Sequence, residues 1–378
     1  MAEREHSERV AAHLVHMIAE AEGWISFADY MHAVLYAPGL GYYTSGARKL
    51  GVGGDFVTAP ELTPLFGRTL AAQAAEVLAE LGTGEIVEVG PGSGVLAADL
   101  LDALAEERAL PERYLLLEVS PELRQRQREL LAARVPGVMP RVVWIDTLPE
   151  RWRGVVIANE LLDAVPAQLV ARRGGDWFER GVTIDAGARF AFHDRPLALG
   201  PLHDMAQRRF PAHGDYASEL NPTSEALVAE LGRRCERGLL LLIDYGFPAA
   251  EYYHPQRDAG TLMAHYRHHA LADPFFCPGL TDITAHVDFS AMARAGVAAG
   301  LTVAGFATQA QFLLACGLLG ALARCGEPES ARYLRAANAV QRLTSPAEMG
   351  ELFKVLALTR GLDLELLGFR DGDRSHRL

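Results

Sequence analysis

The stretch "EIVEVGPGSGVLAADLL", from Glu85 to Leu101, decides the fold. Its apolar run leads into three glycines at alternate positions, Gly90, Gly92 and Gly94, and a helix-like segment follows. Glycines let a backbone approach a ligand closely, and the N–H groups at the start of the next helix favour an anionic group. The stretch predicts a strand, a tight ligand-binding turn and a helix, with a turn that holds no ligand as the alternative.

Short apolar runs alternate with helical patterns through the rest of the chain. The runs lie at 86–89, 114–119, 142–145, 154–158 and 239–244, and two further candidates lie at 301–307 and 354–359. Continuous apolar runs of this kind are typical of parallel strands with helices on both faces of the sheet. The predicted fold class is α/β, a Rossmann-like doubly wound sheet of about seven strands.

Two regions lie outside the predicted sheet. Helical spacing predicts N-terminal helices, one of them capped by Ser26 and Asp29, before a long glycine-rich loop at 40–60. "DWFERGVTID" and "ARFAFHD" alternate like the two strands of a β-hairpin. The predicted organisation is an N-terminal helical segment with a ligand-covering loop (1–80), the sheet core (81–166 and 224–378) and a β-rich insertion (167–223).

Composition excludes several classes of protein. The net charge of −12 over 378 residues argues against a nucleic-acid partner. The four cysteines form no C-x-x-C pair, and "HYRHH" (265–269) lacks carboxylate or cysteine neighbours, so no metal site is expected. The first residues lack the apolar stretch of a secretory signal, and no apolar run is long enough for membrane insertion. A cytoplasmic protein is expected, and its oligomeric state is not predicted.

The groups at the next strand ends narrow the choice of ligand. The dinucleotide fingerprint G-x-G-x-x-G/A would require a small residue where Val95 stands. The second strand ends at Glu118, where a carboxylate can accept hydrogen bonds from both ribose hydroxyls, and the third ends at Asp146, near an expected adenine amino group. The same sheet edge would suit NAD, so the missing small residue favours S-adenosylmethionine (SAM).

A family resemblance rests on these and further motifs. The pattern from Glu88 to Gly94 resembles motif I of class I SAM-dependent methyltransferases. With "GYYTSG", "GGDFVTAPELTPLFG", "ANELLDAVP", "LLIDYGF" and "GLTDITAHVDF" it looks like the MidA-type family over about residues 24–310. The resemblance implies a SAM cofactor and a protein substrate, because the mitochondrial members of that family are complex I assembly factors that methylate an arginine on a complex I subunit.

The resemblance also implies a set of cofactor-binding residues. The glycine turn would line the methionine part of SAM, and the "DFVTAP" stretch would close over the cofactor. The full expected set is Phe56, Thr58, Pro60, Glu88, Gly90, Pro91, Gly92, Gly94, Glu118, Val119, Asp146 and Asn159.

The fourth strand ends in "ANELLDAVP", which supplies the expected catalytic residues Glu160 and Asp163. Guanidinium is always protonated and a poor nucleophile, and carboxylates can clamp it and assist proton loss. In a helical turn the two would be i, i+3 neighbours on one face. The alternative is that Asn159 caps the turn and Asp163 is solvated. Arginine N-methylation is the expected function, and the alternatives are a SAM-binding assembly factor without turnover or a small-molecule methyltransferase.

Three further polar residues have two interpretations each. Asp244, in "LLIDYGF", either orients a substrate group or caps the local turn. His286 and Asp288, in "DITAHVDF", are candidates for substrate contact, although a lone histidine is more often a structural group.

Overall fold

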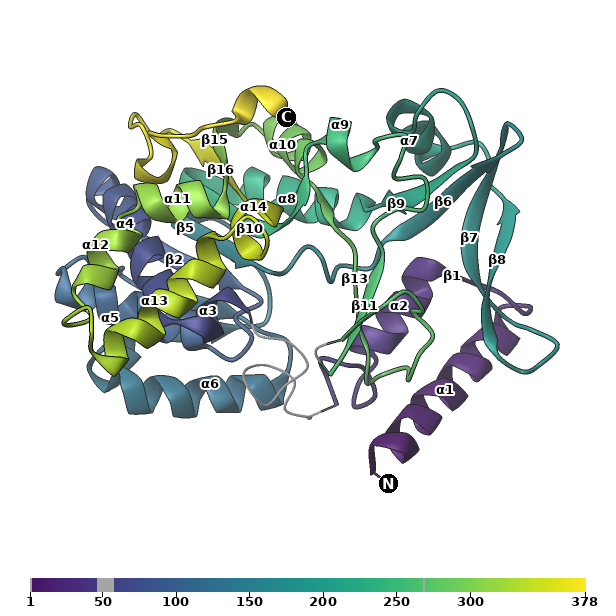
Figure 1. Cartoon of the computed structure of the whole chain (residues 1–378), viewed down its shortest axis with the longest axis horizontal. Coiled ribbons are helices and arrows are strands. Elements are labelled where there is room, and N and C mark those ends of the chain that lie inside the picture. The colour runs from purple at the N-terminus through teal and green to yellow at the C-terminus, as the bar shows by residue number, and fades with distance from the viewer. Residues whose placement is uncertain (1, 46–57, 268) are drawn as a thin grey trace.

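The computed structural model of the chain describes residues 2–45, 58–267 and 269–378. A large sheet covered by helices occupies one side of the molecule, and a second, smaller sheet lies beside it with the N-terminal helices (Figure 1). Of the expected site residues, Phe56 lies outside the described residues.

The large sheet contains all seven predicted strands. Their spatial order is β4 (Val142–Ile145), β3 (Tyr114–Leu117), β2 (Glu85–Val89), β5 (Trp152–Asn159), β10 (Cys235–Phe247), β16 (Phe353–Arg360) and β15 (Thr302–Thr308). The first five run parallel, and β16 is antiparallel to both of its neighbours. The short β14 (Val287–Asp288) pairs with the end of β10. The predicted α/β fold class is confirmed.

The strand order locates the ligand-binding edge. The chain leaves β2 toward β3 on one side of it, and β5 later takes the place on its other side. In open α/β sheets ligands bind at the carboxyl ends of the strands next to such a reversal. The antiparallel β16 between β10 and β15 departs from the usual dinucleotide-binding order of six strands.

Helices cover both faces of this sheet because successive side chains of its strands point to opposite faces. In β5, Val155 and Ile157 enter one apolar cluster, and Val156 and Ala158 enter the other. The first cluster includes residues of α4 (Pro64–Leu81), α5 (Val95–Glu106), α6 (Pro121–Arg134), α11 (Gln309–Ala315), α12 (Leu318–Ala323) and α13 (Ala331–Thr344). The second is closed by α8 (Pro222–Arg234) and α10 (Phe289–Ala298).

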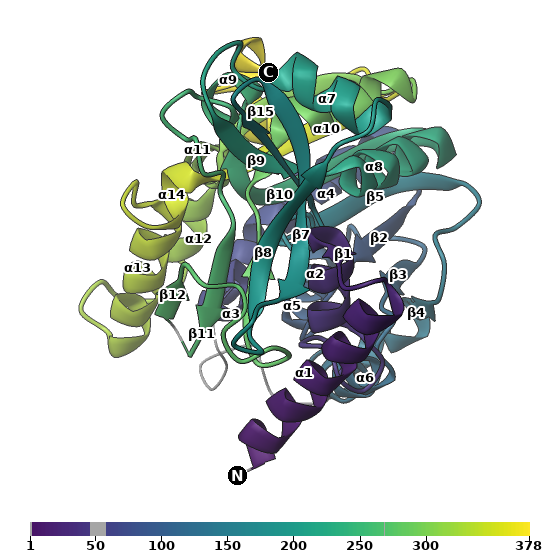
Figure 2. The ribbon, with the colours of Figure 1, turned by 90° about the vertical axis from the view of Figure 1, so that its right-hand side faces the viewer.

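The second sheet carries the N-terminal helices. Its order is β1 (Ile25–Ser26), β7 (Asp176–Ile184), β6 (Gln168–Arg173) and β9 (Tyr216–Leu220), and β8 (Phe190–Pro196) forms the predicted hairpin with β7. Figure 2 shows α1 (Ala2–Glu20) and α2 (Phe27–Tyr36) beside β7 and β8 of this sheet. Apolar residues of both helices, among them Leu14 and Tyr30, share a cluster with Leu169 and Val182. The segment before the core therefore packs on the insertion.

A third, small sheet was not predicted. It consists of β12 (His269–Leu271), β11 (Met263–Tyr266) and β13 (Asp282–Thr284). The remaining elements are short: α3 (Ala59–Leu62), α7 (Pro201–Arg209), α9 (Ala249–Tyr252), α14 (Met349–Leu352) and the 3-10 turns Pro136–Arg141, Leu367–Phe369 and Ser375–Arg377. None of the helices in the described residues is both long and apolar enough to cross a membrane.

Candidate active site

A cavity of about 270 Å³ lies at the carboxyl ends of β2, β3 and β5. The sequence-predicted residues that line it are Thr58, Pro60, Glu88, Gly90, Pro91, Gly92, Glu118, Val119, Asn159, Glu160 and Asp163. Gly94 and Asp146 are not among the residues that line it. The switch point of the sheet thus brings together groups that are spread over about a hundred residues of sequence.

The glycine turn forms one wall of this cavity. All three glycines have positive φ, 71° at Gly90, 53° at Gly92 and 83° at Gly94. A Cβ on Gly90 would lie 2.8 Å from Leu161 Cδ1, and one on Gly94 would lie 3.0 Å from Gln127 Cγ. Only glycine fits both the backbone and the space. The turn therefore presents bare backbone to a ligand, as the close approach of a cofactor requires.

Glu118 is held at the end of β3 for hydrogen bonding into the cavity. Its Oε1 accepts from the Ser120 N–H (2.8 Å), and its Oε2 accepts from Gln127 Nε2 (3.3 Å). Gln127 Nε2 also donates to the Gly92 carbonyl (2.8 Å) and so ties the glycine turn to β3. Burial raises the pKa of Glu118. Sequence reasoning missed Gln127, which sits in α6 with no motif around it.

Asp146 follows β4 at the edge of the sheet and points to solvent. Its side chain is 85% exposed and pairs with Arg124 Nη2 at 2.7 Å. The Arg124 guanidinium also donates to the carbonyls of Glu118 and Ile145. The structure therefore does not bring Asp146 into the cavity, and its contact with adenine stays a prediction.

Glu88 is a buried carboxyl beneath the glycine turn. It is 2% exposed, and the Tyr114 hydroxyl donates to its Oε2 at 2.6 Å. Burial raises the pKa of Glu88 to about 8, since the charged form is poorly solvated there. Glu88 is therefore largely protonated near neutral pH, when the cavity holds no cation.

Glu160 follows β5 in a strained conformation. Its φ of 49° is rare for a residue with a Cβ, and its N–H donates to the Ile243 carbonyl at 2.8 Å. Oε1 accepts from the Ala59 N–H (3.0 Å) and from Asn159 Nδ2 (3.3 Å). No donor among the described residues contacts Oε2. Burial raises the pKa of Glu160 to about 7.

Asp244 holds the turn that carries the catalytic candidates. Its Oδ2 accepts from the N–H groups of Leu161 (3.2 Å), Leu162 (2.9 Å) and Asp163 (3.3 Å). Of its two predicted roles, the structure shows the cap. Residues 160–163 form a turn rather than a helix, so the expected i, i+3 pair on one helical face is wrong. Glu160 and Asp163 instead line the cavity from the two ends of this turn.

Asp163 is buried and incompletely satisfied, so it is not the solvated residue of the alternative interpretation. It is 7% exposed, and its Oδ1 has no hydrogen-bond partner among the described residues. Burial raises the pKa of Asp163, and the nearby Tyr245 hydroxyl, which favours the charged form, lowers it in part. An unpartnered carboxylate oxygen beside a cavity is a natural acceptor for a ligand donor.

Two stacked tyrosines complete the cavity beside these carboxyls. The Tyr36 and Tyr43 rings lie 5.5 Å apart at 23°, and both line the cavity. The Tyr36 hydroxyl donates to the Ala164 carbonyl (3.0 Å), and the Tyr43 hydroxyl donates to Asp282 (3.0 Å). Tyr43 belongs to the "GYYTSG" motif and Tyr36 lies before it in α2, and the sequence predicts no role in the site for either. Aromatic rings next to carboxylates favour a cation, and we call Tyr36, Tyr43, Glu160 and Asp163 the acceptor end.

The other two polar candidates have structural roles. His286 stacks on Phe247 with ring centroids 5.3 Å apart, and burial lowers its pKa to about 4. Asp288 caps α10 through the Ala291 N–H (2.9 Å). Neither lines the cavity. The described part of the chain contains no group of three or more metal-ligating side chains that could hold a metal ion.

Comparison with protein families gives a match over more than half of the chain. Residues 69–307 match the family described as "Putative S-adenosyl-L-methionine-dependent methyltransferase". The matched segment runs from α4 through β15 and includes most of the cavity wall.

Comparison with curated proteins and solved structures agrees with this match. The chain is 29% identical to the protein arginine methyltransferase NDUFAF7 of Danio rerio mitochondria, over 93% of this chain and 87% of that protein. It is 30% identical to the counterpart from Mus musculus, over 92% of this chain and 83% of that protein. A Burkholderia thailandensis protein in complex with S-adenosyl-homocysteine is 50% identical, with a TM-score of 0.96 over 100% of this chain and 98% of that one. A native structure from the same organism superposes with a TM-score of 0.93.

Proposed function

The chain belongs to the S-adenosyl-L-methionine-dependent methyltransferase family, and we propose that the methyl acceptor is an arginine side chain of a protein. The relatives that are aligned over most of their length are named protein arginine methyltransferases. The observation that carries the proposal is the acceptor end, where a buried carboxyl, a half-buried carboxyl and two aromatic rings share one cavity with the glycine turn. A guanidinium is a planar cation with several donors and suits such a lining.

The cofactor fits the rest of the cavity. The bare backbone of the glycine turn admits close approach, and Glu118 offers carboxylate oxygens at the end of the neighbouring strand. Thr58 and Pro60 line the cavity from the far end of the loop that the resemblance assigns to cofactor covering. When bound, the cofactor supplies an electrophilic methyl group on a sulfonium.

The acceptor end would position and deprotonate the guanidinium. The free Oε2 of Glu160 and the unpartnered Oδ1 of Asp163 would accept its N–H donors in charge-assisted hydrogen bonds. A base with a pKa of about 7 is well matched to taking a proton near neutral pH. The Tyr36 and Tyr43 rings would exclude water from the same space. Glu160 would therefore accept the proton that the attacked nitrogen loses.

We further propose that the protein substrate is a subunit of respiratory complex I and that the reaction takes place in the cytoplasm. The family resemblance supports the first part, because mitochondrial members of the family act in complex I assembly. The cysteines support the second, because all four are free, as is usual in a reducing compartment.

The test is transfer of a labelled methyl group from SAM to complex I purified from the same organism. We expect label on one subunit with the wild type and a loss of about 100-fold or more with Glu160→Gln. Glu150→Gln, which makes the same change at an exposed carboxylate that does not line the cavity, is the matched control and should transfer normally. Calorimetry with SAM should give similar affinities for all three proteins. Absence of label with the wild type, or equal transfer by Glu160→Gln, would contradict the proposal.

A further inference from the structure

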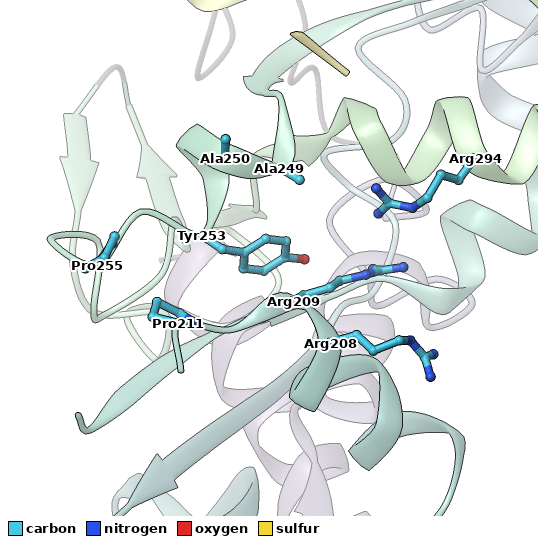
Figure 3. A pocket seen from close by; sticks show the side chains of 8 residues that line it. All are labelled: Arg208, Arg209, Pro211, Ala249, Ala250, Tyr253, Pro255 and Arg294. Atoms are coloured by element: carbon cyan, nitrogen blue, oxygen red, sulfur yellow. The ribbon is translucent and has the colours of Figure 1, made fainter. Parts of the chain in front are cut away.

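A second cavity, of about 700 Å³, lies between α7, α9 and α10 and shares no lining residue with the first (Figure 3). Among the described residues, every charged side chain that lines it is an arginine: Arg208, Arg209 and Arg294. The remaining lining is Tyr253 with alanines and prolines. The positive charge of this lining contrasts with the net charge of −12 of the whole chain.

Arg209 is fixed in place before any ligand arrives. Its side chain is 13% exposed and forms a two-bond pair with Glu225, at 2.8 Å and 2.9 Å. Asp288 Oδ2 lies 3.9 Å from Arg209 and 3.6 Å from Arg294, beyond hydrogen-bond distance of both. Glu225 and Asp288 together balance the charges of Arg209 and Arg294, so the excess positive charge of the cavity comes from Arg208.

Arg208 and Arg294 supply the accessible charge. Arg208 is exposed, and its guanidinium forms no hydrogen bond or ion pair within the part of the chain that the structure describes. The side chain of Arg294 is 53% exposed. Figure 3 shows the arginines on the side toward which the Tyr253 hydroxyl points. With Glu225 and Asp288 counted, three positive groups face two negative ones.

We propose that this cavity binds an acidic segment of a protein partner, whose carboxylates pair with Arg208 and Arg294. Its volume exceeds the need of a single inorganic anion, and its alanines and prolines offer apolar contact between the charges. Arginine and tyrosine are enriched in protein interfaces, and arginine clusters recognise acidic motifs. The proposal is independent of which residue the enzyme methylates.

The test is fluorescence anisotropy with the full chain and a labelled peptide in which glutamates alternate with alanines. The variant Arg208→Glu/Arg294→Glu should bind the peptide about tenfold or more weakly than the wild type. The control Arg332→Glu/Arg335→Glu makes the same charge change on the exposed face of α13 and should bind like the wild type. Binding should weaken with added salt, and SAM affinity should be unchanged in both variants.

Equal binding by the two double variants, or equal binding of a peptide with glutamine in place of glutamate, would overturn the proposal. Binding of inorganic tripolyphosphate without binding of the peptide would assign the cavity to small anions instead. A dimer that only the Arg208→Glu/Arg294→Glu change dissolves would make the occupant a second copy of this chain, and would also overturn it.

Discussion

Glu160 combines a strained backbone with a carboxyl whose pKa is raised to about 7. A conformation of this kind costs of order 1–3 kcal/mol and persists only where its surroundings impose it. The hydrogen bonds to Ile243 and Ala59 provide that restraint on the main chain and the side chain respectively. The result is a base aimed into the cavity that is partly protonated at neutral pH.

This pKa predicts the pH dependence of the reaction. Below pH 7 the protonated Glu160 can neither attract a guanidinium nor accept its proton, and above pH 7 it can do both. We expect kcat/KM for methyl transfer to rise with pH and to level off above about 7. Glu150→Gln should keep this profile. A rate for the wild type that is flat between pH 5.5 and 8 would remove Glu160 from the proton transfer.

A matched glycine pair tests the turn. Gly90 and Gly82 have similar φ values, 71° and 75°, but a Cβ would clash with Leu161 at Gly90 and meet nothing within 4 Å at Gly82. Both alanine variants should lose about 1 kcal/mol of folding free energy from the backbone alone. Only Gly90→Ala should also lose SAM affinity, by about tenfold or more, in a calorimetric titration. Equal SAM affinities for the two variants would contradict the close approach at Gly90.

The choice of SAM over NAD was right, although the reason given from the sequence was weak. The third small residue of the fingerprint allows the helix to pack closely on the strand. Val95 is half-buried, so it does not lie in that contact. Ala97 of α5 is fully buried, and Gly92-x-Gly94-x-x-Ala97 itself fits the dinucleotide spacing. The position of β16 and the bound ligand of the Burkholderia relative separate the two classes better. Glycine spacing alone could not distinguish SAM from NAD, because both ligands bind to the same kind of turn.

At the scale of elements, the turn between β5 and β6 depends on Asp244 of β10. One buried oxygen accepts three successive N–H groups, so this carboxylate fixes the turn that bears Glu160 and Asp163. The sequence predicts a cap as one role of Asp244 because an apolar run ends there, although β10 continues to Phe247. It could not predict the partners of Asp244, since these lie about eighty residues earlier.

Replacement of Asp244 tests this positioning role. Asp244→Ala would leave three buried N–H groups unsatisfied and should lower the free energy of unfolding by about 3 kcal/mol. It should lower kcat more than it raises KM for SAM, because the glycine turn and Glu118 lie on other strands. Asp244→Asn keeps one acceptor oxygen and should recover part of both losses. Full activity of the alanine variant, with kcat and thermal midpoint unchanged, would refute the role.

The strands of the large sheet could be predicted because each is a continuous apolar run that ends in polar residues. The small sheet of β11, β12 and β13 could not, since its strands have three or four residues without alternation. Contacts between β13 and α2 hold it in place, and these join segments about 250 residues apart. Glu160 and Asp163 of the acceptor end could be predicted because they follow the end of a strand. Tyr36 and Tyr43 could not be predicted, since they reach the cavity only through the packing of the N-terminal segment.

At the scale of the whole molecule, the N-terminal helices couple the two larger sheets. α1 and α2 pack on the second sheet, and Tyr36 at the end of α2 lines a cavity in the first. Stability in such an arrangement need not be uniform, because each sheet has its own apolar clusters.

A pair of core substitutions tests this division. Leu14 and Leu104 are both fully buried, the first in the cluster under the second sheet and the other in the large-sheet cluster. Each leucine-to-alanine change should cost about 3 kcal/mol. Hydrogen exchange should rise in β6 and β7 for Leu14→Ala and in β2 and β5 for Leu104→Ala. Uniform acceleration in both sheets by either variant would show a single cooperative unit instead.

The most direct test of the central claim identifies the methylated atom. Tandem mass spectrometry of the acceptor protein, after reaction with SAM carrying a labelled methyl group, should place the label on an arginine guanidinium nitrogen. The same analysis after reaction with Glu160→Gln should find that arginine unmodified, while calorimetry shows SAM still bound. Label on a lysine, a carboxylate or a small molecule, or on arginine to the same extent with Glu160→Gln, would contradict the account.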